Sequence, residues 1–298
     1  MIRILRNLLK IPINVLYSLI IFYNKLVKKI DPNSLENYLE ELFQKKIDEK
    51  IGSDIKFKDN YFHDLSEYKS KFYNYNQPLK FYTPTKIASH RVSSLFLKEP
   101  YTIEWIEKNG GDNIPFIDIG ANIGLYSIYY AHIFDAKVYS FEPSFRNLDL
   151  FVRNINLNKL NESITLIANP LSETSQIGFF NIKTNLAGLA SAGFKNKDFL
   201  QKNSKFNFST LSISADSFFS NTENFDKALI KIDIDGGEAY ILKGTKNFLN
   251  KLKSVYLEIE TRSSTKEEVK KILDNLKFKL VKEINFSSLS IEFWIKES

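Results

Sequence analysis

The stretch of residues 115–127 constrains the fold of this chain more than any other. It begins with the apolar run Phe116–Ile119, which contains the carboxylate of Asp118, and it passes through Gly120 and Gly124. Apolar residues at helical spacing follow the glycines. An apolar run, a glycine turn and a helical pattern predict a buried strand that leads into a helix. A turn of this kind lets a ligand lie against its backbone.

Strand-like and helix-like segments continue to alternate after this unit. We expect strands at 116–119, 137–141, 164–168, 228–234 and 254–260, and helices at 123–134, 144–158, 237–249 and 264–276. Two more strands, at 280–286 and 291–295, follow without a helix between them. This order predicts an α/β fold with a mostly parallel sheet and an antiparallel C-terminal edge. Residues 176–182 predict a strand outside the alternation, and residues 184–207 are interpreted as a long loop.

The excess positive charge of the chain lies in its first thirty residues. The net charge is +6, and residues 1–30 carry six Lys and Arg but no acidic residue, which leaves the remainder neutral. This distribution argues against a nucleic-acid partner and favours peripheral contact with a membrane surface. Residues 11–23 are almost entirely apolar, yet they are shorter than the roughly 20 residues of a spanning helix. We expect a cytoplasmic protein, and the pattern leaves open whether residues 1–30 lie on the inner membrane face or pack on the protein.

Three regions follow from these patterns. Residues 1–30 are a basic apolar helix, residues 31–85 are an accessory extension with helical and aromatic-rich parts, and residues 86–298 are the α/β domain. The aromatic residues of the extension are read either as a sugar-stacking face or as the cover of a core. The chain has no Cys and three His, which argues against disulfides, a thiolate zinc site and a Ser-His-Asp hydrolase.

The glycine pattern distinguishes two classes of cofactor. A dinucleotide fold requires G-x-G-x-x-G directly after the strand, but counting from Gly120 this chain has Asn122 and Leu125 at the second and third glycine positions. The pattern D-x-G-x-G-x-G fits better, with Asp118 first and Gly124 last. Asn122 takes the middle position, where Asn tolerates a left-handed backbone. The turn therefore favours S-adenosylmethionine over NAD(P).

A second carboxylate supports this interpretation. Glu142 follows the strand at 137–141, where it can accept hydrogen bonds from both ribose hydroxyls of the cofactor. Asp118 is placed to meet the ammonium group of the methionine moiety, directly or through water, and the glycines let the ligand approach the backbone. The predicted cofactor-binding residues are Asp118, Gly120, Ala121, Asn122, Gly124, Glu142 and Pro143.

Other motifs carry a resemblance to a known family. They are Lys98-Glu99-Pro100, residues 116–127, Ser140–Ser144, Asn154–Asn158, Ile230–Glu238 and Leu257–Glu260. Over residues 90–260 the chain resembles the FkbM family of S-adenosylmethionine-dependent methyltransferases. This resemblance implies a Rossmann-like class I methyltransferase fold and O-methylation, commonly of sugars or other secondary metabolites. Residues 169–172 depart from the Ala-Leu-Ser run that family members often have there.

The end of the strand at 228–234 carries the most charge. Lys231, Asp233 and Asp235 share one side of it by alternation. A lysine and an aspartate in an otherwise apolar strand are costly unless they are paired or functional, and the sequence leaves both readings open. We expect Asp233 to be the base or the group that orients the acceptor hydroxyl. Lys231, Asp235 and Glu258 are the further catalytic candidates, and Glu238 is a second choice for the base.

The sequence thus predicts an S-adenosylmethionine-dependent O-methyltransferase that acts on a sugar hydroxyl in a cell-surface glycan or glycolipid. Two alternatives stay open: an NAD(P)-dependent oxidoreductase of Rossmann type, and a non-catalytic methyltransferase-fold module in glycan assembly. No metal is expected, because two neighbouring carboxylates alone are weak evidence for a cation site.

Overall fold

The computed structural model describes residues 62–64, 78–182, 188, 192–195, 206–220, 222 and 224–297. The predicted basic helix at 1–30 and most of the accessory region therefore lie outside the described residues. Within the described ranges, no helix combines the length and the apolarity needed to cross a membrane.

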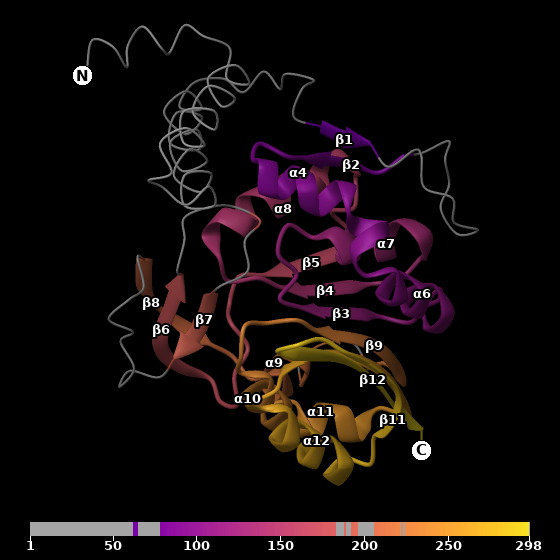
Figure 1. Ribbon diagram of the computed structural model, residues 1–298, viewed down its shortest axis with the longest axis vertical. Helices are drawn as coiled ribbons and strands as arrows, with labels where there is room; N and C mark the ends of the chain where they lie inside the picture. Colours follow the sequence, from indigo (N-terminus) through magenta and orange to yellow (C-terminus); the bar gives the residue numbers. More distant parts are fainter. Residues whose placement is uncertain are drawn as a thin grey trace, which may run out of the picture. The chain divides into compact units, whose positions relative to one another are not determined.

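A seven-stranded sheet forms the centre of the described fold (Figure 1). Its strands are β3 (Phe116–Ile119), β4 (Val138–Phe141), β5 (Ile164–Ile167), β9 (Lys227–Ile232), β10 (Ser254–Arg262), β11 (Lys279–Asn285) and β12 (Leu289–Glu297). They lie in the order β11-β12-β10-β9-β3-β4-β5. The pairs from β10 to β5 are parallel, whereas β12 is antiparallel to both β10 and β11. The predicted parallel sheet with an antiparallel C-terminal edge is confirmed.

Helices cover both faces of this sheet (Figure 1). One face carries α4 (Lys86–Ser93), α5 (Leu95–Lys98), α6 (Pro100–Asn109), α7 (Leu125–Ile133) and α8 (Phe145–Leu157). The other face carries α9 (Ala215–Phe219), α10 (Glu238–Lys243), α11 (Lys246–Lys251) and α12 (Lys266–Asn275). The strands are buried on both faces because each face packs on helices, which explains why β3 and β9 read as apolar runs.

The prediction of a single helix at 237–249 is wrong. The structure has two short helices there, α10 and α11, which are separated by Gly244 and Thr245. A Cβ atom at Gly244 would come within 2.3 Å of the backbone oxygen of Ser172, so the loop after β5 packs directly on the break. The Thr245 hydroxyl donates to the carbonyl of Ile241 at 2.6 Å, which satisfies the end of α10. The contact between Gly244 and Ser172, which are distant in sequence, thus determines where the helix is interrupted.

A second, three-stranded antiparallel sheet stands outside the main one. It contains β6 (Gln176–Ile182), β7 (Ala192–Lys195) and β8 (Phe206–Ser212) in the order β7-β6-β8. The predicted extra strand at 176–182 is confirmed. The prediction of a continuous loop at 184–207 is wrong, because 192–195 pairs with β6 and β8 begins at 206. The sequence of β7, with its small and polar residues, does not indicate a strand. The segment is a strand because it pairs with β6.

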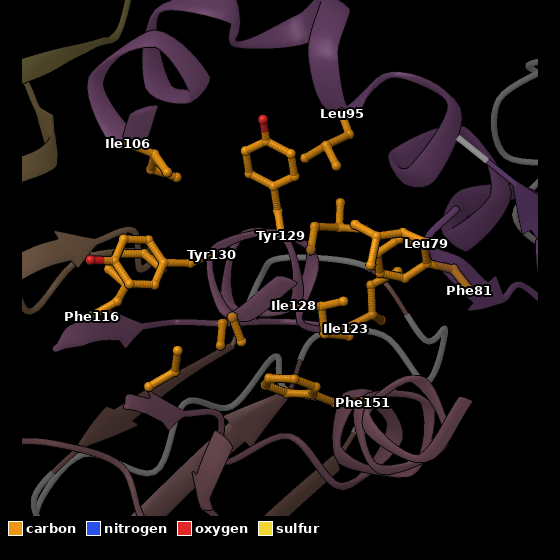
Figure 2. Packing of buried hydrophobic residues seen from close by; sticks show 14 of the residues in the cluster. Leu79, Phe81, Leu95, Ile106, Phe116, Ile123, Ile128, Tyr129, Tyr130 and Phe151 are labelled. Carbon is orange, nitrogen blue, oxygen red and sulfur yellow. The ribbon is translucent and has the colours of Figure 1, made fainter. Parts of the chain in front are cut away.

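The core on the α7 side extends to residues before the predicted α/β domain. Two short strands, β1 (Phe62–Asp64) and β2 (Lys80–Tyr82), pair with each other. Figure 2 shows Leu79 and Phe81 in the cluster that also contains Ile123 and Phe151. The backbone N–H of Tyr82 donates to Asn154 of α8 at 2.7 Å. The aromatic residues at 81 and 82 therefore cover a core, which was one of the two readings of this region.

Candidate active site

A cavity of about 310 Å³ lies at the carboxyl ends of the parallel strands. Its wall includes 119–122 at the end of β3, 141–143 at the end of β4, 233–237 after β9, and Glu260 in β10. Ligands of open α/β sheets bind at this edge, and the volume is typical of a small-molecule site. The two ends of the predicted site, one from the glycine turn and one from β9, therefore meet in one cavity.

The glycine turn is shaped by packing inside the protein. Gly120 has φ +88°, and a Cβ atom there would come within 2.0 Å of the backbone oxygen of Asp233. Gly124 has φ +86°, and its Cβ atom would come within 2.1 Å of the Phe151 ring. Gly120 lines the cavity with Ala121 and Asn122, but Gly124 does not. We expected Gly124 to make room for a ligand. In the structure it makes room for the Phe151 ring, so that α7 can pack on α8.

Asn122 and Glu142 join the glycine turn to the end of β4. Asn122 has φ +53°, as predicted for the middle position of the turn. Its backbone N–H donates to Glu142 Oε2 at 2.8 Å, and the N–H of Ser144 donates to Oε1 at 2.8 Å. Burial raises the pKa of Glu142 to about 7, although these hydrogen bonds oppose the shift. Glu142 and Pro143 both line the cavity.

Asp118 lies behind the cavity wall and is not among the residues that line it. Its side chain is only 1% exposed and accepts a hydrogen bond from the Ser127 hydroxyl at 2.5 Å. Ser127 also contacts the Ser140 hydroxyl at 2.8 Å. Burial raises the pKa of Asp118 to about 6. The geometry gives Asp118 the task of holding β3, β4 and α7 together, and a direct contact with a cofactor ammonium is not supported.

Lys231 is the centre of a buried charge network behind the cavity. It is 3% exposed, and its Nζ lies 3.1 Å from Asp233 Oδ2 and 3.4 Å from Glu258 Oε1. The Tyr126 ring centroid lies 5.1 Å from the same Nζ. Burial alone would lower the pKa of Lys231, but the neighbouring carboxylates outweigh it and raise that pKa well above its ordinary value. Lys231 is therefore held as a cation.

Glu258 belongs to the support of the site and does not line the cavity. It is almost fully buried and accepts a hydrogen bond from Thr102 of α6 at 3.0 Å. Burial raises its pKa to about 7 and outweighs the opposing effect of Lys231. Of the predicted catalytic residues, Lys231 and Glu258 thus lie behind the wall and Asp233 and Asp235 lie in it.

The carboxylates after β9 have different environments. Asp233 lines the cavity with a side chain that is 34% exposed. Asp235 pairs with Arg262 at 2.8 Å. Glu238 is buried and accepts hydrogen bonds from the N–H groups of Gly236 and Gly237 at 3.0 and 3.1 Å, so it stabilises the start of α10. Among the residues that the structure describes, no group of three or more His, Cys, Asp or Glu is placed to hold a metal ion.

A family model described as the methyltransferase FkbM domain matches residues 118–283, more than half of the chain. The chain belongs to the FkbM methyltransferase family. The predicted membership is confirmed, and the protein is an S-adenosylmethionine-dependent methyltransferase with the expected Rossmann-like fold. No curated protein matches its sequence.

Solved methyltransferase structures are similar to this FkbM methyltransferase at low sequence identity. A methyltransferase FkbM from Methylobacillus flagellatus KT is 16% identical with a TM-score of 0.42, over 70% of this chain and 52% of that one. A precorrin-6y C5,15-methyltransferase from Geobacter metallireducens GS-15 is 12% identical with a TM-score of 0.43, over 68% and 90%. Magnesium protoporphyrin IX methyltransferase from Synechocystis PCC 6803, with bound SAM, is 10% identical with a TM-score of 0.42, over 71% and 84%.

The charges of the cavity fit the cofactor of the FkbM family. Four carboxylates and two cationic side chains line it: Glu142, Asp233, Asp235 and Glu260, with Arg91 and Lys98. S-adenosylmethionine carries a sulfonium and an ammonium group, which an excess of carboxylates favours. A dinucleotide would instead bring a pyrophosphate to the same wall. The residues present thus suit the methyl donor, and the NAD(P) alternative has no support in the site.

Two acidic residues of the site were missed by sequence reasoning. Glu260 lines the cavity, and the β9–β10 register places it beside Asp233. Glu99, at the start of α6, accepts hydrogen bonds from Tyr126 at 2.5 Å and from Lys98 at 2.7 Å. Burial would raise the pKa of Glu99, but the nearby cations and hydrogen bonds outweigh it and lower that pKa to about 2. Alternation along β10 places Glu260 on the face of Glu258 and was the available signal.

Proposed function

We propose that this FkbM methyltransferase transfers the methyl group to a hydroxyl of a sugar in a cell-surface glycan or glycolipid. The observation that carries the proposal is the position of Asp233. It stands in the wall of the cavity that contains Glu142, and Lys231 holds one of its oxygens at 3.1 Å. A carboxylate fixed in this way can accept a hydrogen bond from an acceptor hydroxyl with its other oxygen.

The lining of the cavity supports a sugar as the acceptor. Tyr240 of α10 lines the same cavity as Asp233 and Asp235 and is largely exposed. Carboxylates accept hydrogen bonds from sugar hydroxyls, and an aromatic ring can cover the apolar face of a sugar.

Bound S-adenosylmethionine supplies an electrophilic methyl group on a sulfonium. The protein's part is to hold and orient the two reactants. Glu142 would accept hydrogen bonds from the ribose, and Asp233 would orient the acceptor hydroxyl. Lys231 holds the Asp233 carboxylate in place, and Lys231 itself is held by Glu258. Positioning of this kind accounts for a large part of the barrier reduction in a displacement reaction.

Methyl transfer from labelled S-adenosylmethionine to fractionated cell-surface glycans tests this proposal. We expect label in a glycan fraction with the wild type and a loss of transfer with Asp233→Asn. Asp226→Asn is the matched control, since Asp226 is exposed and pairs with Lys253 at the other end of β9. Label found only in protein or nucleic acid would contradict a glycan acceptor.

We also propose that residues 1–30 bring the enzyme to an anionic membrane surface, and that 31–85 is an accessory region before the methyltransferase domain at 86–298. The clustered charge of residues 1–30 supports the membrane contact. Each Lys or Arg near such a surface contributes about 1 kcal/mol. Full-length protein should therefore sediment with anionic vesicles and lose this binding when the six basic residues become Gln. Equal binding to neutral vesicles would contradict the proposal.

A further inference from the structure

The carboxylates of the cavity differ in how their oxygens are occupied. Glu142 accepts from two backbone N–H groups, Asp235 pairs with Arg262, and Asp233 accepts from Lys231. Glu260 also lines the cavity, and no hydrogen bond or ion pair joins its side chain to any of the described residues. A group that takes a proton from a substrate needs a free oxygen within reach. Glu260 meets this requirement best.

The surroundings of Glu260 suit a proton acceptor. Its side chain is half-buried on β10, one position beyond the Ile259–Ile232 pair, and therefore next to Asp233. Burial first, and then the negative charge of Asp233, raise the pKa of Glu260 to about 7. General bases act most efficiently when their pKa lies near the working pH. Asp233, by contrast, already has one oxygen hydrogen-bonded to the ammonium group of Lys231.

We propose that Glu260 is the catalytic base that removes the proton of the acceptor hydroxyl, while Asp233 orients that hydroxyl. The inference rests on the proposed function. The acceptor oxygen forms a bond to the methyl carbon, and the bond from that carbon to the sulfonium sulfur breaks with its electron pair left on sulfur. The hydroxyl proton passes to a carboxylate oxygen of Glu260 and then to solvent. No further reactant is needed.

Charged and titratable groups from three elements act on Glu260. They are Lys231 of β9 with Asp233 directly after it, Glu99 and Lys98 at the junction of α5 and α6, and Tyr101 of α6. The carboxylates raise the pKa of Glu260, and the lysines lower it. Asp233→Asn removes a neighbouring negative charge, so we expect it to lower the pKa of Glu260.

The first test compares wild type, Glu260→Gln and Glu260→Asp in methyl transfer to the glycan fraction. We expect Glu260→Gln to lower kcat by about 10²- to 10⁴-fold, the usual contribution of a general base, and Glu260→Asp to restore part of it. Calorimetry should give the same affinity for S-adenosylhomocysteine in all three proteins. Glu162→Gln, at an exposed position before β5, is the matched control and should keep full activity.

The second test reads the proton directly, without turnover. In the S-adenosylhomocysteine complex with ¹³C-labelled glutamate, a carboxyl signal that titrates near neutral pH should vanish in Glu260→Gln and move to lower pH in Asp233→Asn. Full transfer by Glu260→Gln, or titration of Glu260 near the ordinary Glu pKa of 4.5, would overturn the role of Glu260 as base but not the proposed function. A wild type that methylates no hydroxyl acceptor would overturn the proposed function and this inference with it.

Discussion

The backbone oxygen of Asp233 occupies the space that a side chain on Gly120 would need, since a Cβ atom there would come within 2.0 Å of it. The contact joins the turn after β3 to the end of β9. We expect Gly120→Ala to lower the free energy of unfolding by ~3 kcal/mol or more, because it adds a clash with backbone to a left-handed φ. Denaturant unfolding measures the loss.

Gly236 provides the matched control for this prediction. It has a similar φ of +91°, but a Cβ atom there would meet nothing within 4 Å. Gly236→Ala should therefore cost only the left-handed strain, about 1–2 kcal/mol. Equal losses in the two variants would show that the contact with Asp233 contributes nothing.

Glu142 is expected to determine cofactor affinity. Glu142→Gln places an amide where the carboxylate accepts from the N–H groups of Asn122 and Ser144, and it removes the charge that faces the cavity. A charged hydrogen bond contributes about 1.5–3 kcal/mol, so affinity for S-adenosylhomocysteine should fall roughly 10- to 100-fold. Calorimetric titration measures this, with Asp149→Asn, a surface variant on α8, as the control. Unchanged affinity would exclude Glu142 from the ribose site.

Removal of the buried cation should be costly. Lys231→Met leaves Glu258 and Asp233 without their partner, and loss of one member of a buried pair typically costs 3–5 kcal/mol. Adding Glu258→Gln should recover part of this loss, because the uncompensated buried charge is then gone. Denaturant unfolding of the two single variants and the double variant gives the coupling. Strictly additive losses would contradict a direct Lys231–Glu258 interaction.

Asp118 should make stability depend on pH. Its pKa is raised by burial from 3.8 to about 6 in the folded protein, so the folded state binds a proton more tightly than the unfolded state does. The free energy of unfolding should therefore fall, through this group, as pH rises from about 4 to about 6. Asp118→Asn should lack this component, so it should gain stability relative to wild type over that range in urea titrations.

Ser127 supplies the complementary variant. Its hydroxyl donates to Asp118 at 2.5 Å and so opposes the rise in the Asp118 pKa. Ser127→Ala should move the stability change to higher pH. A difference between wild type and Asp118→Asn that stays constant with pH would contradict the assignment.

Much of the main sheet could be predicted from local patterns, because strands such as β3 and β4 are short, mostly apolar segments that end at turn residues. The carboxylates Glu142 and Asp233 were placed at strand ends for the same reason, since parallel strands bring their carboxyl ends to one edge. What local pattern could not predict depends on contacts distant in sequence. The strand at 192–195 is defined by its pairing with β6, and the break at Gly244 by its contact with Ser172.

The candidate site also depends on contacts distant in sequence. Asp118 was expected to meet the cofactor directly or through water, but in the fold it is buried against Ser127 of α7 and does not line the cavity. Glu99 and Glu260 are far apart in the sequence, and only folding brings both close enough to Lys231 for its charge to act on them. Alternation within one strand identifies a face, but it cannot tell which distant element will cover that face.

The three-stranded sheet has a consequence for how such an enzyme can change over evolution. It shares no strand with the main sheet, and the segments that follow β5 and β8 meet in a bridge between Leu171 and Ile213. Phe180 and Phe194 of this smaller sheet nevertheless line the cavity. Substitutions in these strands can reshape one wall while the hydrogen bonds of the main sheet stay intact. Selection can thus adjust what the cavity accepts and leave the strand pairing of the main sheet untouched.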